Sequence, residues 1–219
     1  MRKLFSPLPP LFMLLLACAA AHAQPARRPG RETRCGAAAT RYVHPSPDKK
    51  FLTVEAEDDY EYRGMKKYLS VCGDMDDAFT QRVREEVATY EGGLTLRRLL
   101  PAVGRPDSPE SKDPHAYAAI AGAYEASVTE LTSWRRINTL PEVDEGYAQE
   151  IGEKTDLLVD AYARAVAACG ARADCRTQKA AWTRKLTEFY KSRHGDSDAG
   201  LDEFIRGALE RPLPQTLKR

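Results

Sequence analysis

The segment between residues 140 and 190 constrains the fold more strongly than any other part of the chain. In its first half, apolar or small residues recur every three or four positions, which places them on one face of an α-helix. They are Val143, Tyr147, Ile151, Thr155, Leu158, Tyr162, Val166 and Cys169, and after Cys175 the spacing resumes at Gln178, Trp182, Leu186 and Phe189. Gly170 follows the first stripe, where a residue with positive φ often ends a helix. We therefore predict two long antiparallel helices joined by a turn between Cys169 and Cys175.

Similar periodic patterns cover most of the remaining chain. Residues that commonly cap helix starts precede these patterns, and glycine or proline follows several of them. The predicted starts are Asp58, Asp74, Asp113, Asp174 and Ser197 or Asp198, and the predicted ends include Gly73 and the Gly92–Gly93 pair. With mostly short connections between these segments, the pattern is typical of an all-α protein, a helical bundle of five to six helices.

Composition divides the chain into a leader, one ordered domain and a short tail. Residues 24–34 carry four arginines together with proline and glycine, which indicates a flexible leader after a signal peptide at 1–23. Residues 35–211 form the predicted single helical domain, and 212–219 form the tail. The proline-rich stretch 101–113 is a candidate hinge within the domain, because it is too short to separate two independent domains.

The N-terminus carries the most specific signal in the sequence. Arg2 and Lys3 precede an apolar run over 11–20, and Ala21-His22-Ala23 then fits the small-x-small pattern of a signal-peptidase site. The run is too short to span a bilayer, which takes about 20 residues. Leu15-Leu16-Ala17-Cys18 offers an alternative, a lipoprotein cleavage site that would leave Cys18 as a lipidated N-terminus. We expect a periplasmic or secreted protein, with a lipid anchor through Cys18 as the second interpretation.

Export makes the cysteine count informative. After loss of the signal peptide, Cys35, Cys72, Cys169 and Cys175 remain. Four thiols in an oxidising compartment usually form two disulfides, for which three pairings exist. We favour Cys35 with Cys72 and Cys169 with Cys175, because the second pair is close along the chain at a helix turn. A zinc site is disfavoured, since no Cys-x2-Cys or His-x3-His spacing accompanies these residues.

Charge and hydropathy argue against two kinds of partner. The whole chain has a formal net charge of +1, and removing residues 1–23, which hold two bases and no acid, leaves −1. A near-neutral chain lacks the attraction that nucleic-acid binding requires, so we expect no nucleic acid as a partner. No later stretch is long and apolar enough for a transmembrane span. The sequence leaves the oligomeric state open.

The sequence contains no recognisable catalytic or cofactor motif. His44, His115 and His194 lie far apart, without the spacing of a metal site. The nucleophile-elbow, Walker and dinucleotide-binding patterns are absent from the sequence. We therefore assign no catalytic residue, no cofactor and no metal ligand.

Two groups of side chains remain as candidate sites. Acids crowd the first half of the central helix at Glu142, Asp144, Glu145, Glu150, Glu153 and Asp156. They mostly avoid the apolar stripe, so a solvated face is the simpler interpretation and a glycosidase-like acid pair is the alternative. Tyrosines could line a groove, although several fall on apolar stripes where packing explains them better. These are Tyr60, Tyr62, Tyr68, Tyr117, Tyr124, Tyr147 and Tyr162.

One segment is similar to a known group of proteins. Cys169-Gly170, four further residues and Cys175 are followed by Trp182, Arg184, Leu186 and Phe189. This stretch, residues 169–190, resembles a segment of the small bacterial envelope proteins related to lysozyme inhibitors. The resemblance implies an exported, disulfide-pinned, non-enzymatic binder.

These observations support three functional hypotheses. The first is an exported non-enzymatic binding or inhibitor protein of the cell envelope, whose partner is another envelope protein or an extracellular enzyme. The second is a structural or accessory envelope component. The third is a helical cell-wall hydrolase that uses buried acids, and it ranks last because no acid pair can be placed in a cleft from sequence.

Overall fold

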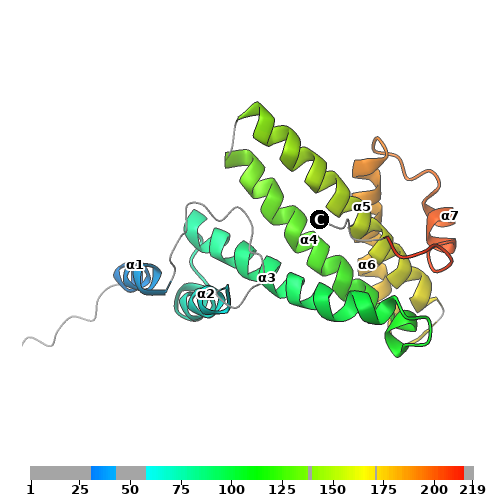
Figure 1. Ribbon diagram of the computed structural model, residues 1–219, viewed down its shortest axis with the longest axis horizontal. Helices are drawn as coiled ribbons and strands as arrows, with labels where there is room; N and C mark the ends of the chain where they lie inside the picture. Colours follow the sequence, from blue (N-terminus) through cyan, green and yellow to red (C-terminus); the bar gives the residue numbers. More distant parts are fainter. Residues whose placement is uncertain (1–30, 43–57, 138–139, 171, 215–219) are drawn as a thin grey trace, which may run out of the picture.

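The computed structural model describes residues 31–42, 58–137, 140–170 and 172–214, and these ranges are helical without any β-strand (Figure 1). The α-helices are α1 (Arg31–Tyr42), α2 (Asp58–Cys72), α3 (Ala78–Val103), α4 (Pro114–Ile137), α5 (Pro141–Cys169), α6 (Arg176–Arg193) and α7 (Leu201–Arg206). A short 3-10 helix, η2 (Pro109–Lys112), lies between α3 and α4. The all-α prediction is confirmed. The predicted signal peptide, residues 1–23, lies outside the described residues.

The central helical hairpin is present, and α5 is its longest element. α5 packs along α4 on one side and against α6 and α7 on others, and α4 and α5 run antiparallel beside each other (Figure 1). Between Leu158 and Val166 every residue of α5 is buried, so the helix has no solvated face there. The main hydrophobic core therefore surrounds α5 and includes residues from α3, α4, α6 and α7.

A second, smaller core lies at the N-terminal end of α3. Its buried residues come from α1, α2 and the first turns of α3, and Cys35 and Cys72 lie within it. Their Cα atoms are 5.7 Å apart and the sulfurs form a disulfide. The hydroxyls of Tyr68 and Thr80 are hydrogen-bonded at 2.7 Å in this core. α3 thus belongs to both cores and connects them (Figure 1).

The second disulfide crosses the turn of the central hairpin. Cys169 ends α5 and Cys175 immediately precedes α6, with their Cα atoms 6.0 Å apart. Both disulfides have the pairing favoured from the sequence. Stable disulfides indicate an oxidising, non-cytoplasmic compartment. Among the described helices, none combines the length and apolar character needed to cross a membrane.

Several predicted helix ends are correct and others are displaced. Gly73 directly follows α2, Gly170 has φ 47° after α5, and the carboxylate of Asp113 accepts a hydrogen bond from the His115 amide at the start of α4. The cap of α3 is Asp77 rather than Asp74, because Asp77 accepts hydrogen bonds from both the amide and the hydroxyl of Thr80.

The last two predicted helix starts are also wrong. α6 follows Cys175 and not Asp174, whose carboxylate is instead held by Arg172 at 2.6 Å. α7 begins at Leu201, after Gly200 with φ 85°, rather than at Ser197 or Asp198. The capping residues read from the sequence therefore predict both helix starts one to three residues too early.

The prediction that a helix ends at Gly92–Gly93 is wrong, because α3 continues through both residues. The reason lies in the packing of α3 on α4. A Cβ added at Gly92 would lie 3.1 Å from both the Cα and the carbonyl oxygen of Ala123. Glycine is needed there for close approach of two helices, and it costs helix stability without ending the helix.

The proposed hinge at 101–113 contains an ordered hydrogen-bonded turn. The Ser108 hydroxyl donates to the carbonyl of Ala102 at 2.6 Å and accepts from the Ser111 amide at 3.1 Å. The Tyr117 hydroxyl on α4 donates to the carbonyl of Ser111 at 2.9 Å. These bonds tie η2 to both neighbouring helices, while hinge motion itself stays a prediction.

Replacing Gly92 with leucine tests the helix contact. Gly92→Leu should lower the free energy of unfolding by about 1–3 kcal/mol, because the side chain forces α3 away from Ala123. The matched control is Gly122→Leu on α4, where an added Cβ meets no atom within 4 Å. That variant should gain about 0.5–1 kcal/mol from helix propensity. Urea unfolding followed by circular dichroism measures both, and equal effects of the two changes would contradict the close contact.

The two disulfides should differ in their contribution to stability. The Cys35–Cys72 bridge closes a sequence separation of 37 and the Cys169–Cys175 bridge one of 6. On the chain-entropy account, serine replacement of both partners should cost about 4 kcal/mol for the first and about 2 kcal/mol for the second. Urea midpoints of the two double variants give the comparison. A larger loss from the shorter loop would show that loop entropy is not the dominant effect.

Candidate functional site

Two charged residues lie inside the core, one helical turn apart on α5. Asp160 and Arg164 are the only charged residues between Leu157 and Ala168, and their side chains are 9% and 3% exposed. Arg164 Nε donates to Asp160 Oδ2 at 2.6 Å. A buried charge is tolerated only when it is paired and hydrogen-bonded, so this pair needs further partners.

Those partners come from the end of the chain. We call residues 211–214 the C-terminal strap. Arg164 Nη2 donates to the backbone carbonyls of Arg211 and Pro212, each at 2.9 Å. Arg211 Nη2 in turn donates to Asp160 Oδ1 at 3.1 Å. The charged pair on α5 therefore holds the strap across the bundle through two main-chain contacts and one side-chain contact.

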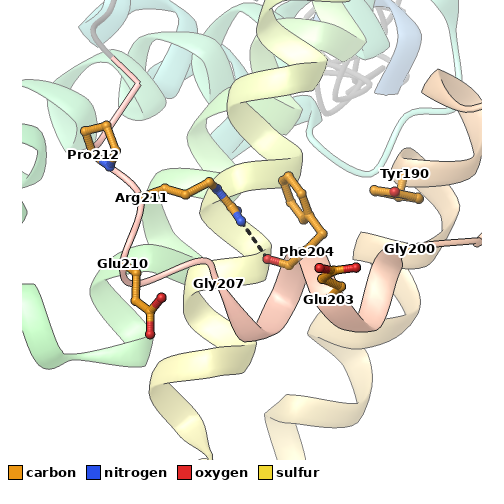
Figure 2. A pocket seen from close by; sticks show the side chains of 8 residues that line it. All are labelled: Tyr190, Gly200, Glu203, Phe204, Gly207, Glu210, Arg211 and Pro212. Atoms are coloured by element: carbon orange, nitrogen blue, oxygen red, sulfur yellow. Dashed lines mark hydrogen bonds between the residues drawn. The ribbon is translucent and has the colours of Figure 1, made fainter.

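A solvent-open hollow of about 640 Å³ lies on one side of the strap (Figure 2). We call it the α6–α7 hollow. Tyr190 reaches it from α6, Glu203 and Phe204 from α7, and Arg211 from the strap, as Figure 2 shows. It is completed by Gly200, Gly207, Glu210 and Pro212.

Aromatic groups and a fixed arginine form the middle of the α6–α7 hollow. The Arg211 guanidinium lies 4.0 Å from the Phe204 ring centroid and donates to the Phe204 carbonyl at 2.8 Å (Figure 2). Tyr190 is buried, stacks on His194 at 3.8 Å and donates to the Ala199 carbonyl. These contacts hold the aromatic surface in a defined position.

The rim of the α6–α7 hollow is acidic. Glu203 and Glu210 are exposed, and within the described part of the chain neither carboxylate has an ion-pair or hydrogen-bond partner. Arg211 is already engaged by Asp160 and the Phe204 carbonyl, so it does not neutralise them by direct pairing. The hollow therefore offers an aromatic surface beside two unpaired negative charges.

On the other side of the strap lies a groove of about 500 Å³, which we call the strap groove. It runs between the end of α3, η2 and the last turns of α5. Its lining residues are Val103, Gly104, Pro106, Ser111, Lys112, Tyr117, Arg164, Ala167, Ala168, Leu209, Arg211 and Leu213. Arg164 and Leu213 also line a much smaller, partly open space of about 20 Å³ next to Tyr117 and Tyr124. Burial raises the pKa of Tyr124 to about 12, so its hydroxyl is neutral at physiological pH.

A different pair of acids lies between α3 and α4. Burial raises the pKa of Glu130 to about 7, and nearby Glu86 adds to this rise while hydrogen bonds from Thr89 and Trp134 oppose it. Burial also raises the pKa of Glu86 and is the largest influence on it. The Arg82 guanidinium covers the Trp134 ring at 5.3 Å. Glu130 is thus a carboxyl group whose charge changes near neutral pH.

The acids expected on the first half of α5 are dispersed and paired. Arg135 binds Asp144 through two hydrogen bonds, and Arg193 binds Asp156 in the same way. Gln149 donates to Glu153 at 2.9 Å, and the side chain of Glu142 lies outside the described residues. The first half of α5 is therefore a face of paired and solvent-accessible charges, as the simpler interpretation expected.

The candidate histidines do not come together. His115 meets Trp182 edge to face at 5.4 Å, His194 stacks on Tyr190, and His44 lies outside the described residues. Across the described ranges no three His, Cys, Asp or Glu side chains are grouped so that they could hold a metal ion.

Most of the candidate tyrosines pack in the interior. Tyr68, Tyr117, Tyr124, Tyr147 and Tyr162 are buried, whereas Tyr62 is partly exposed. The Tyr162 hydroxyl donates to Glu125 at 2.8 Å, and the same carboxylate accepts from Lys185 at 2.6 Å. The side chain of Tyr60 lies outside the described residues. Packing thus explains the buried tyrosines, and only Tyr117 and Tyr124 border one of the cavities described above.

Sequence reasoning missed the residues that form the hollow and the groove. Asp160 and Arg164 had a readable signal, because an acid and a base spaced by four in an otherwise apolar run indicate a buried ion pair. Glu203 and Glu210 had no comparable signal. They lie on either side of the end of α7, and the fold brings both to the hollow that Tyr190 also lines.

Comparison with known proteins identifies no relative of this chain. No protein-family model, no curated protein and no solved structure matches the chain. The resemblance of residues 169–190 to envelope proteins related to lysozyme inhibitors stays a prediction.

Glu130 predicts a specific pH dependence of stability. Its pKa is about 7 in the folded protein and 4.5 in the unfolded chain, so between these values the folded state binds more protons and stability falls as pH rises. Glu130→Gln should therefore raise the free energy of unfolding by about 2–3 kcal/mol at pH 8 and change it little at pH 4. Urea unfolding at both pH values measures this. Glu145→Gln, at an exposed position on α5, is the control and should show no such difference between the two values.

Proposed function

We propose that the protein is an exported, non-enzymatic binding protein of the cell envelope, periplasmic or secreted, that inhibits a wall-degrading enzyme. The observation that carries the proposal is the α6–α7 hollow, where an ordered aromatic surface lies beside two unpaired carboxylates. The two disulfides support an extracytoplasmic site of action.

The chemistry of the α6–α7 hollow favours a cationic partner. Glu203 and Glu210 attract lysine or arginine, and Phe204 offers a ring edge for the aliphatic part of such a side chain. The hollow is open to solvent, which suits a protruding segment of another protein better than an enclosed small molecule. Interfaces of this kind depend on a few aromatic and charged residues at their centre.

The pairing of acids elsewhere supports binding rather than catalysis. Asp144, Asp156 and Asp160 each have an arginine partner, and Glu125 has Lys185. A carboxylate already engaged by a guanidinium or an ammonium group is not free to transfer a proton to a substrate. At the rim of the α6–α7 hollow, by contrast, Glu203 and Glu210 are exposed and available to a partner.

A cell-wall hydrolase is a second candidate, favoured by one observation. Glu130 has a pKa near that of a general acid working at neutral pH, and Glu86 is a second carboxylate nearby. The Glu130→Gln variant tests this candidate directly. Purified protein that clears a cell-wall suspension and loses this activity on Glu130→Gln, while staying folded, would favour the hydrolase over the binder.

Charge reversal at the rim tests the binding proposal. A cationic c-type lysozyme serves as the muralytic probe, with binding measured by titration calorimetry and inhibition by clearing of a cell-wall suspension. The protein should bind and inhibit the enzyme, and Glu203→Lys combined with Glu210→Lys should abolish both effects through like-charge repulsion. Glu188→Lys, at an exposed position of α6 outside the hollow, is the matched control and should bind as the unaltered protein does.

Two results would overturn the proposal. One is absence of binding and inhibition by the unaltered protein. The other is equal binding by the unaltered protein and by the doubly reversed variant, which would place the contact away from the α6–α7 hollow.

A further inference from the structure

We infer that the strap groove is a binding site for an extended peptide segment of a partner protein, and that the C-terminal strap occupies it in cis. The ligand expected is a stretch of main chain with two consecutive free carbonyls followed by a leucine-sized apolar side chain. The inference rests on the proposed function only for the identity of the partner, because the groove and the α6–α7 hollow share Arg211 alone among their lining residues.

Arg164 is positioned to donate hydrogen bonds to the main-chain carbonyls of a bound segment. Its guanidinium is locked by Asp160 at 2.6 Å and points one nitrogen at the carbonyls of two successive residues, Arg211 and Pro212. Contacts to carbonyls do not depend on the side chains of the bound segment. The pair on α5 thus presents a fixed donor that any extended segment with accessible carbonyls could use.

Beside this donor is a small site for an apolar side chain, occupied by Leu213, which we call the seat. Leu213 lines both the strap groove and the small space next to Tyr117 and Tyr124, and it packs against the main core. The backbone at Gly104 helps to form the seat, since a Cβ added there would lie 3.7 Å from Leu213 Cδ1. The seat supplies selectivity for side-chain size, which the carbonyl contacts lack.

The strap fills the groove incompletely. About 500 Å³ remains open beside it, and Pro212 and Pro214 are exposed. Neither proline has an amide hydrogen to donate, so the strap is held by the Arg164 and Asp160 contacts, by the contacts of Arg211 with Phe204 and Gly207, and by Leu213. Proline also favours an extended conformation that binds with little loss of entropy. A terminal segment whose contacts are made largely through main-chain carbonyls and one leucine could be replaced by a similar segment from another chain.

Peptide binding to the full-length protein tests the inference. The probe is a fluorescein-labelled synthetic peptide with the sequence of residues 211–219, and fluorescence anisotropy reports its binding. In the unaltered protein the tethered strap competes with the peptide. Leu213→Asp in the protein should release the strap, because an aspartate cannot occupy the apolar seat, and should strengthen peptide binding by about tenfold or more.

Two controls make the result specific to the groove. Leu94→Asp makes the same change at an exposed leucine of α3, away from the strap, and the variant should bind the peptide as weakly as the unaltered protein. A peptide in which the leucine equivalent to Leu213 is aspartate should bind none of the proteins. Leu213→Ala provides a milder release of the strap if the aspartate variant is unstable.

The outcomes separate this inference from the proposed function. Folded Leu213→Asp or Leu213→Ala protein that fails to bind the peptide better than the unaltered protein overturns it. Loss of cooperative unfolding in both variants also overturns it, because the strap would then be an integral part of the core. The peptide assay contains no envelope protein or enzyme, so its failure does not contradict the proposed enzyme binding at the α6–α7 hollow. Failure of enzyme binding likewise does not contradict peptide binding in the groove.

Discussion

The ion pair between Asp160 and Arg164 is the interaction on which the C-terminal third of the protein depends. Removing two charges from water costs several kcal/mol for each ion, and the cost is offset only when both ions are paired and their remaining atoms are hydrogen-bonded. Here the strap completes the shell, with its carbonyls accepting from Arg164 and Arg211 donating to Asp160. Throughout the described residues no buried side-chain nitrogen or oxygen lacks a partner. The strap is therefore held by the charged pair on α5, and it contributes Arg211 and Pro212 to the hollow and Arg211 and Leu213 to the groove.

α3 connects this part of the protein with the small N-terminal core. Its C-terminal half contributes Leu99 and Val103 to the main core, and its N-terminal half contributes Val83 and Val87 to the other. The close approach at Gly92 lets one continuous helix serve both cores. The smaller core contains few buried residues, so the Cys35–Cys72 bridge is a substantial part of what holds α1 in place.

Hydrophobic periodicity was sufficient to predict the helices, because a stripe with a 3.6-residue repeat has few alternatives when it runs for several turns. Local signals for helix starts and ends were less reliable, because tertiary packing also determines where a helix begins and ends. Gly92 looked like a helix end and is a contact point, and Asp74 looked like a cap although Asp77 makes the hydrogen bonds. Capping chemistry is available to any nearby acid, so sequence alone does not choose between them. The hollow could not be predicted from the sequence for a different reason, since Tyr190, Phe204 and Arg211 become neighbours only through the fold.

Arg211 belongs to both candidate sites, which has a thermodynamic consequence. Its backbone carbonyl is bound by Arg164 in the strap groove, while its side chain covers Phe204 in the α6–α7 hollow. A peptide that displaces the strap must also withdraw Arg211 from Phe204 and remove a positive charge from the neighbourhood of Glu203. The hollow would then be more negative and its aromatic ring more accessible, so on the proposed function we expect a cationic partner to bind it more tightly. By linkage, we expect such a partner to favour the displaced strap to the same extent, which would couple the two proposed sites.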